Sequence, residues 1–178
     1  MNKEKKLLQI LERFRNQLSD EEIAFIDECS KEMKPIKEEG NSLDSEYSLF
    51  IDGAAEFDKD LRPNNAGIGG LIKREDEFVY SFSENIGIRT NNEAEYSALI
   101  QGIKACLDHK IYHINIFSDS ELIVNQVNGK YKLKDSKMIE LHAEVKKLCS
   151  KLEFWTISHI PREQNEEADH LSKLGLIK

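Results

Sequence analysis

The sequence predicts an α/β fold in which a five-stranded mixed sheet is flanked by helices. Two observations carry this prediction. From residue 46 to residue 87, three apolar segments follow one another with turn-like residues between them, as in a strand meander. After residue 90, helical and strand-like patterns alternate, which favours parallel strands joined by helices. The expected order of elements is β-β-β-α-β-α-α-β-α.

Two helical patterns precede the sheet, within residues 4–34. Apolar residues recur at helical spacing in the first, and a capping box, SDEE, opens the second, which Pro35 ends. The polar, Gly-containing residues 37–45 are typical of a linker. We therefore expect an N-terminal helical pair with its linker at residues 1–45 and a separate domain at residues 46–178.

The first three strands are expected in the segments YSLFIDG, AGIGGLIKRE and EFVYSFSENIG. The first is a short apolar run that is expected to end at Asp52 and Gly53, with a long acidic loop, AAEFDKDLRPNNAG, after it. A charged turn between the second and third segments, at residues 74–77, suits a hairpin.

Helices and strands alternate over the rest of the chain. NNEAEYSALIQGIKACLDH is a helical segment, and its apolar residues share one face: Ala94, Ala98, Leu99, Gly102, Ile103 and Cys106. YHINIFSD is the expected fourth strand, followed by the helices SELIVNQVNG and SKMIELHAEVKKLCSKL. EFWTISHI is the expected fifth strand, and NEEADHLSKLGLI the closing helix.

Composition narrows the class of protein. The 178-residue chain is 33% charged with a net charge of −8, so its overall charge does not point to nucleic-acid binding. The acidic balance does not exclude such binding either, because a metal site needs clustered carboxylates. Its three cysteines are odd in number and lack the spacing of metal ligands, which indicates free thiols. The sequence shows no signal peptide and no membrane-spanning run, so we expect a cytoplasmic protein without a membrane partner. We also expect a monomer.

Four acids stand at places where a site is expected. Asp119 follows the apolar run INIF at the carboxyl end of a strand, where open α/β sheets keep their ligand crevices. Asp52, Glu95 and Asp169 lie in the segments FIDGAA, TNNEAEYSALIQGI and REQNEEADHLSK. In this order, the four segments resemble the ribonuclease HI (type 1 ribonuclease H) family. The likeness is to its compact bacterial and archaeal members and to the ribonuclease H domains of reverse transcriptases.

The resemblance implies a catalytic domain at residues 46–178 that hydrolyses the RNA strand of RNA/DNA hybrids and leaves 5′-phosphate and 3′-hydroxyl ends. It also implies two Mg²⁺ ions, with Mn²⁺ as a second candidate metal. Asp52 would bridge both ions, Glu95 and Asp119 would complete one site, and Asp169 the other. Four acids suit this role because Mg²⁺ prefers hard oxygen ligands and serves both ends of an in-line displacement.

Further residues match the family's auxiliary positions. His159, ten residues before Asp169, matches a histidine on a mobile loop that assists proton or product departure. Thr90, Asn91 and Asn92 match a substrate-contacting segment. The residues Gly53 and Ala54 match a segment whose backbone approaches the 2′-hydroxyl groups of RNA.

Alternatives remain at the level of the residues and of the function. Asp52 could be a turn residue, Glu95 a first-turn helix acid, Asp119 an N-cap and His159 a strand-end surface residue. The chain could also be a nucleic-acid-binding module with weak or lost catalysis, or a nuclease of the same fold that acts on another duplex. Glu121, where many family members carry Gln, is a departure that bears on substrate approach.

Overall fold

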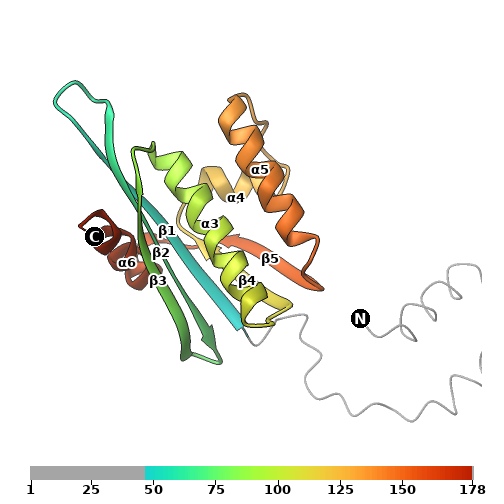
Figure 1. The fold of residues 1–178 in the computed structure, drawn as a ribbon. Helices are drawn as coiled ribbons and strands as arrows, with labels where there is room; N and C mark the ends of the chain where they lie inside the picture. The colour runs from blue at the N-terminus through green and yellow to red at the C-terminus, as the bar shows by residue number, and fades with distance from the viewer. Residues whose placement is uncertain (1–46, 178) are drawn as a thin grey trace, which may run out of the picture. The chain divides into compact units, whose positions relative to one another are not determined.

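A single five-stranded mixed sheet, with the strand order β3-β2-β1-β4-β5, organises residues 47–177, which the computed structural model describes (Figure 1). The predicted helical pair and linker at residues 1–45 lie outside this part. The strands are β1 (Tyr47–Phe57), β2 (Pro63–Arg74), β3 (Glu77–Gly87), β4 (His113–Ser118) and β5 (Phe154–His159). The helices are α3 (Asn91–Asp108), α4 (Glu121–Val127), α5 (Ser136–Cys149) and α6 (Glu166–Leu176), with a short 3-10 turn, η2 (Arg162–Gln164), before α6.

The first strand is longer than the sequence predicted. It runs through Asp52 and Gly53 to Phe57, so the expectation that it ends at these two residues was wrong. Its second half pairs antiparallel with the start of β2, and Gly53 stands opposite Ile68. The supposed acidic loop is therefore the outer part of a β-hairpin, since its backbone groups find partners across the ladder.

The second hairpin, between β2 and β3, was predicted correctly. Its two turn residues, Glu75 and Asp76, have φ angles of 48° and 71°. Positive φ at both central residues matches the right-handed twist of the strands that a two-residue turn joins. The charged turn thus aligns β3 along the edge of the sheet.

Helices cover both faces of the sheet. Helix α3 packs on β1 and β2, whereas α6 packs on β2, β1 and β3 (Figure 1). Gly53 faces the backbone of α3, and the neighbouring strand's Gly69 faces the backbone of α6; a Cβ atom at either glycine would overlap that backbone. The glycines allow both helices to lie close to the sheet. No helix among residues 47–177 is long and apolar enough to cross a membrane.

The core lies between the sheet and the helices α3, α4 and α5. The predicted apolar face of α3 is buried, and it meets the inward residues of the central strands. The fully buried large side chains include Tyr96, Leu49, Ile51, Ile72, Leu99, Ile103, Ile114, Ile116, Ile123, Val127 and Val145. Burial of this much aliphatic surface fixes the strand register, because a slip of one residue would turn these side chains to the other face.

Strand pairing places a crevice at the centre of the sheet. β4 runs parallel to β1, with Phe117 opposite Phe50, and β5 runs parallel to β4, with His159 opposite Ser118. β4 and β5 end at these residues, whereas β1 continues past them to Phe57. The carboxyl end of β4 therefore lies beside the middle of β1, and that of β5 lies beside the end of β4.

Candidate active site

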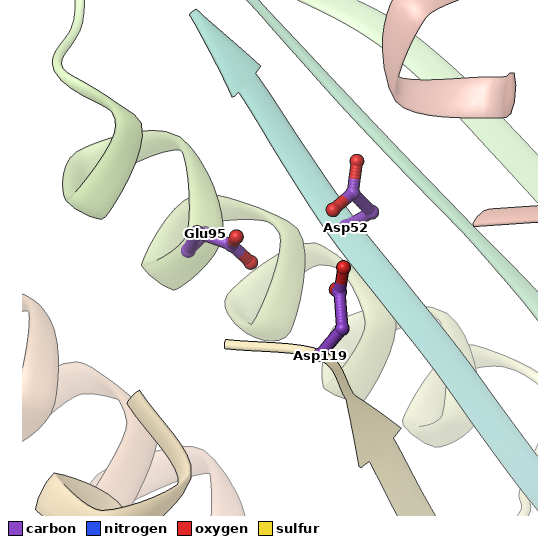
Figure 2. A group of neighbouring side chains, drawn as sticks. All are labelled: Asp52, Glu95 and Asp119. Atoms are coloured by element: carbon purple, nitrogen blue, oxygen red, sulfur yellow. The ribbon is translucent and has the colours of Figure 1, made fainter. Parts of the chain in front are cut away.

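Three of the four predicted acids converge at this crevice. Asp52, Glu95 and Asp119 each offer a carboxylate oxygen, and these oxygens lie within 4.8 Å of one another. Figure 2 shows the three side chains pointing toward one another from β1, from α3 and from the end of β4. We call these residues the carboxylate triad.

The fold explains why these acids meet. Parallel pairing of β4 with β1 brings the end of β4, and hence Asp119, beside Asp52. Gly53 then lets the first turns of α3 approach β1 closely, which delivers Glu95 to the same place. Strand pairing and helix packing, and not contacts among the three side chains, therefore bring these distant residues together.

The structural alternatives for the triad are excluded by position. Asp52 lies within a paired strand opposite Gly69 and is not a turn residue. The acid in the first turn of α3 is Glu93, which closes a capping box with Thr90. The N-cap of α4 is Ser120, so Asp119 does not cap that helix.

Burial and mutual repulsion disfavour the charged forms of two triad members. Burial, together with the charges of Asp119 and Asp169, raises the pKa of Asp52 to about 6, although a hydrogen bond from Ser172 opposes the shift. Burial and the charges of Asp52 and Asp119 raise the pKa of Glu95 to about 9, against a hydrogen bond from the Gly53 N–H. Close carboxylates in a desolvated place behave in this way when no cation compensates them.

The triad suits a hard divalent cation. Glu95 Oε2 is buried and has no hydrogen-bond partner, and a buried polar oxygen of this kind is costly unless something pairs with it. A bound cation would satisfy that oxygen and remove the repulsion that raises the two pKa values. Carboxylate oxygens without nitrogen or sulfur ligands favour Mg²⁺ or Mn²⁺ over softer metals.

Asp169 lies in the same pocket but is held differently. Arg162 Nη2 is 2.5 Å from its Oδ1, and Lys173 Nζ is 2.6 Å from its Oδ2. Burial alone would raise the pKa of Asp169, but the hydrogen bonds and charges of Lys173 and Arg162 hold it below its ordinary value. Its carboxylate is outside the group of three that lies within 4.8 Å.

The pocket above these acids has a volume of about 470 Å³. The triad and Asp169 line this pocket. Most of the predicted substrate-binding residues line it as well: Gly53, Ala54, Asn91 and Asn92. Asn91 also accepts a hydrogen bond of 3.0 Å from the Ala55 N–H, which ties the start of α3 to β1. Thr90 is the N-cap of α3 and closes a capping box with Glu93, and it is not among the residues that line the pocket, so its substrate role stays a prediction.

His159 is not among the residues that line this pocket. It is the exposed last residue of β5, opposite Ser118, so it lies in the fifth strand as predicted and not on a loop like the family's histidine. The strand continues to this residue because its ladder with β4 does. An auxiliary role for His159 therefore stays a prediction.

Sequence reasoning missed four residues around the acids. Arg162 and Lys173 line the pocket, and the buried Asn165 and Ser172 hydrogen-bond to Asp119 and Asp52. One signal was available: Ser172 and Lys173 follow Asp169 by three and four residues, which places them on the same side of a helix. The contact of Asn165 with Asp119 spans 46 residues and had no comparable local signal.

Comparisons with known proteins agree with this geometry. A family model described as reverse transcriptase-like matches residues 52–175. Ribonuclease HI of Halobacterium salinarum is 31% identical over 128 residues, which cover 71% of this chain. The crystal structure of ribonuclease H1 from this archaeon has a TM-score of 0.69 at 30% identity, over 74% of this chain and 97% of that one. LC11 ribonuclease H1, solved in complex with an RNA/DNA hybrid, has a TM-score of 0.68 at 31% identity, over 74% and 96% of the two chains.

The matched region is only part of several curated relatives. The alignment covers 62% of the halobacterial ribonuclease HI and 31% of the bifunctional protein Rv2228c of Mycobacterium tuberculosis, which is 30% identical over 112 residues. The solved structures nevertheless match across nearly their whole length, which confirms the predicted ribonuclease H-like fold. With the family model matching from Asp52 into α6, the chain belongs to the ribonuclease H family, in the group described as reverse transcriptase-like.

Proposed function

We propose that the chain is a metal-dependent endonuclease that hydrolyses the RNA strand of RNA/DNA hybrids, with 5′-phosphate and 3′-hydroxyl products. The observation that carries the proposal is the convergence of Asp52, Glu95 and Asp119 within 4.8 Å in a pocket that Asp169 also lines. The relatives named ribonuclease H, and the LC11 enzyme solved with a hybrid, support the choice of substrate.

The triad is the expected holder of a first divalent cation, and Asp52 with Asp169 the expected holder of a second. Mg²⁺ is our first choice and Mn²⁺ the alternative, since both take carboxylate oxygens. When bound, these ions activate water and neutralise the charge that develops on the phosphate. The protein's own part is to hold four carboxylates in place and to bring a phosphodiester to them.

We expect several residues that line the pocket to bind the substrate. Asn91 and Asn92 are short polar residues that line the pocket, and such groups fix a nucleic-acid backbone without reading its sequence. Arg162 and Lys173 bring positive charge to a wall that is otherwise acidic. Because phosphate contacts dominate affinity, these two cations offset part of the repulsion between the carboxylates and the nucleic acid.

Cleavage of a panel of labelled duplexes, with and without Mg²⁺, tests this function. We expect the hybrid to be cut on its RNA strand only when Mg²⁺ is present, and an all-DNA duplex to remain intact. Equal cutting of the DNA duplex would favour a nuclease with another substrate. Binding of the hybrid without any cutting would favour the binding module.

A further inference from the structure

Asn165 is an almost completely buried asparagine at the start of α6, with 1% of its surface exposed. It occupies the N-cap position, but its side chain makes no capping hydrogen bond to the helix. An asparagine in this position usually accepts a hydrogen bond from the first turn. The side chain of Asn165 is therefore used for something else.

The amide of Asn165 donates to two acceptors that belong to the carboxylate triad's surroundings. Its Nδ2 is 3.0 Å from the carbonyl oxygen of Ile51, the residue before Asp52, and 2.9 Å from Asp119 Oδ1. Through its own backbone carbonyl, Asn165 also accepts a hydrogen bond of 3.0 Å from the Asp169 N–H. One residue thus connects the strand that carries Asp52, the carboxylate of Asp119 and the helix that carries Asp169.

The chemistry of the two acceptors fixes the orientation of this amide. A carbonyl and a carboxylate both require a donor, so the NH₂ group and not the oxygen must face them. The Oδ1 atom of Asn165 is left buried and without a partner. An unpaired buried oxygen costs free energy, so the hydrogen bonds that the NH₂ group donates explain why the side chain keeps this orientation.

A neutral donor also leaves the charge of the triad intact. Asp169 is paired with the cations Arg162 and Lys173, whereas the carboxylate of Asp119 receives the uncharged amide of Asn165. A hydrogen bond from a neutral amide orients a carboxylate without competing electrostatically with a metal ion. Partners of this kind behind metal ligands set ligand orientation in metalloproteins.

We propose that Asn165 is a positioning residue for cation binding. It holds one carboxylate oxygen of Asp119 against β1 and leaves the other free to ligate the cation. This inference rests on the metal site of the proposed function. Asn165 does not line the pocket, so it acts through Asp119 and not by contact with the substrate.

The test is calorimetric titration of Mg²⁺ into the full-length protein without nucleic acid. In Asn165→Ala we expect the dissociation constant of Mg²⁺ to rise about tenfold to a hundredfold, the usual effect of removing a partner behind a metal ligand. Hybrid cleavage should require a correspondingly higher Mg²⁺ concentration for half-maximal rate and recover toward the wild-type rate when Mg²⁺ saturates.

Asn128→Ala is the matched control. The Asn128 amide also donates to a strand carbonyl, that of Ile157 at 3.1 Å, but it touches none of the four acids. We expect this variant to bind Mg²⁺ like the wild type. A melting temperature lowered in both variants, with Mg²⁺ affinity lowered only in Asn165→Ala, separates positioning of the ligand from bracing of the fold.

If Asn165→Ala does not fold, Asn165→Ser takes its place, because serine is a favoured N-cap and its shorter side chain cannot reach both acceptors. Unchanged Mg²⁺ affinity in a folded Asn165 variant would overturn the inference and leave the proposed function standing. A wild-type protein that binds no Mg²⁺ would overturn both.

Discussion

The carboxylate triad and Asp169 lie in one pocket but are stabilised in opposite ways. The triad is desolvated, and burial and mutual repulsion raise the pKa values of Asp52 and Glu95, although Asp52 accepts a neutral hydrogen bond from Ser172 that opposes the shift. Asp169 forms ion pairs with Arg162 and Lys173, which lower its pKa. The comparison indicates that a metal ion would bind most favourably at the triad, because no salt bridge with another described residue neutralises its carboxylates and only the more distant charge of Arg162 offsets their repulsion.

The difference also determines what a second cation would have to displace in order to bind. At Asp169, an incoming ion would replace Arg162 and Lys173, whose side chains are 67% and 56% exposed. Ion pairs with partners so exposed are weak and easily exchanged. We therefore expect the two cations to contact a phosphate if a metal ion takes their place at Asp169.

The largest expected effect concerns cleavage by Asp52→Asn and Asp169→Asn. Asp52→Asn should slow hybrid cleavage by about a thousandfold or more, since metal stabilisation of the transition state is worth several kcal/mol. Asp169→Asn should cost less, because Asn keeps the shape and the neighbouring cations remain near the phosphate. Single-turnover rates at saturating Mg²⁺ measure both. Equal losses would break the distinction between the triad and Asp169.

A pH titration of the metal-free protein's stability gives the next largest effect. Asp52 and Glu95 have folded-state pKa values of about 6 and about 9, above their ordinary values of 3.8 and 4.5. Between pH 3.8 and about pH 9, the native state therefore binds more protons at these two groups than the unfolded state does, so their contribution to the free energy of unfolding should fall as pH rises. Asp169 has the opposite sign: its contribution is present above pH 3.8 and is lost as pH falls through its lowered pKa.

Urea unfolding of the metal-free protein across this window checks the two signs. Glu95→Gln should flatten the decline toward high pH, because Gln does not titrate. Adding Mg²⁺ should flatten it as well. A free energy of unfolding that rises steadily toward pH 9 would contradict the raised pKa values of the triad.

The smallest expected effect is that of His159→Ala. If this exposed residue assists proton or product departure from beyond the pocket, its loss should slow turnover by about tenfold to a hundredfold. The rate of the chemical step in a single turnover should change less than the steady-state rate. An unchanged steady-state rate would identify His159 as a strand-end surface residue.

The fold was predictable from the sequence because local patterns carry it. The apolar face of α3 and the charged turn at Glu75 and Asp76 appeared where they were expected. The end of β1 was misplaced, since Asp52 and Gly53 look like a strand end until β2 is known to pair beyond them. The helices at residues 1–45, the monomeric state and the cytoplasmic location stay predictions.

The candidate site was predictable only in part, for a physical reason. Carboxylates that bind one metal ion must lie close together, and the order of the four acid-containing segments along the sequence indicated that they do. The groups that tune them do not follow from local sequence: Asn165 meets Asp119, and Ser172 meets Asp52, across 46 and 120 residues. Such contacts depend on how closely α6 packs on the glycines of β2, which only the three-dimensional structure supplies.

The measurement that tests the central claim most directly compares wild type with Asp119→Asn in two assays. Hybrid cleavage and the Mg²⁺-induced rise in melting temperature are recorded for both proteins. We predict that the variant folds, loses cleavage and shows a much smaller rise, because ligand binding to the native state alone stabilises it, by about 2.7 kcal/mol at a hundred times the dissociation constant. Without Mg²⁺ its melting temperature should equal or exceed that of the wild type, since one repelling charge is gone. A variant that cuts at the wild-type rate would contradict the assignment of Asp119 to a metal site.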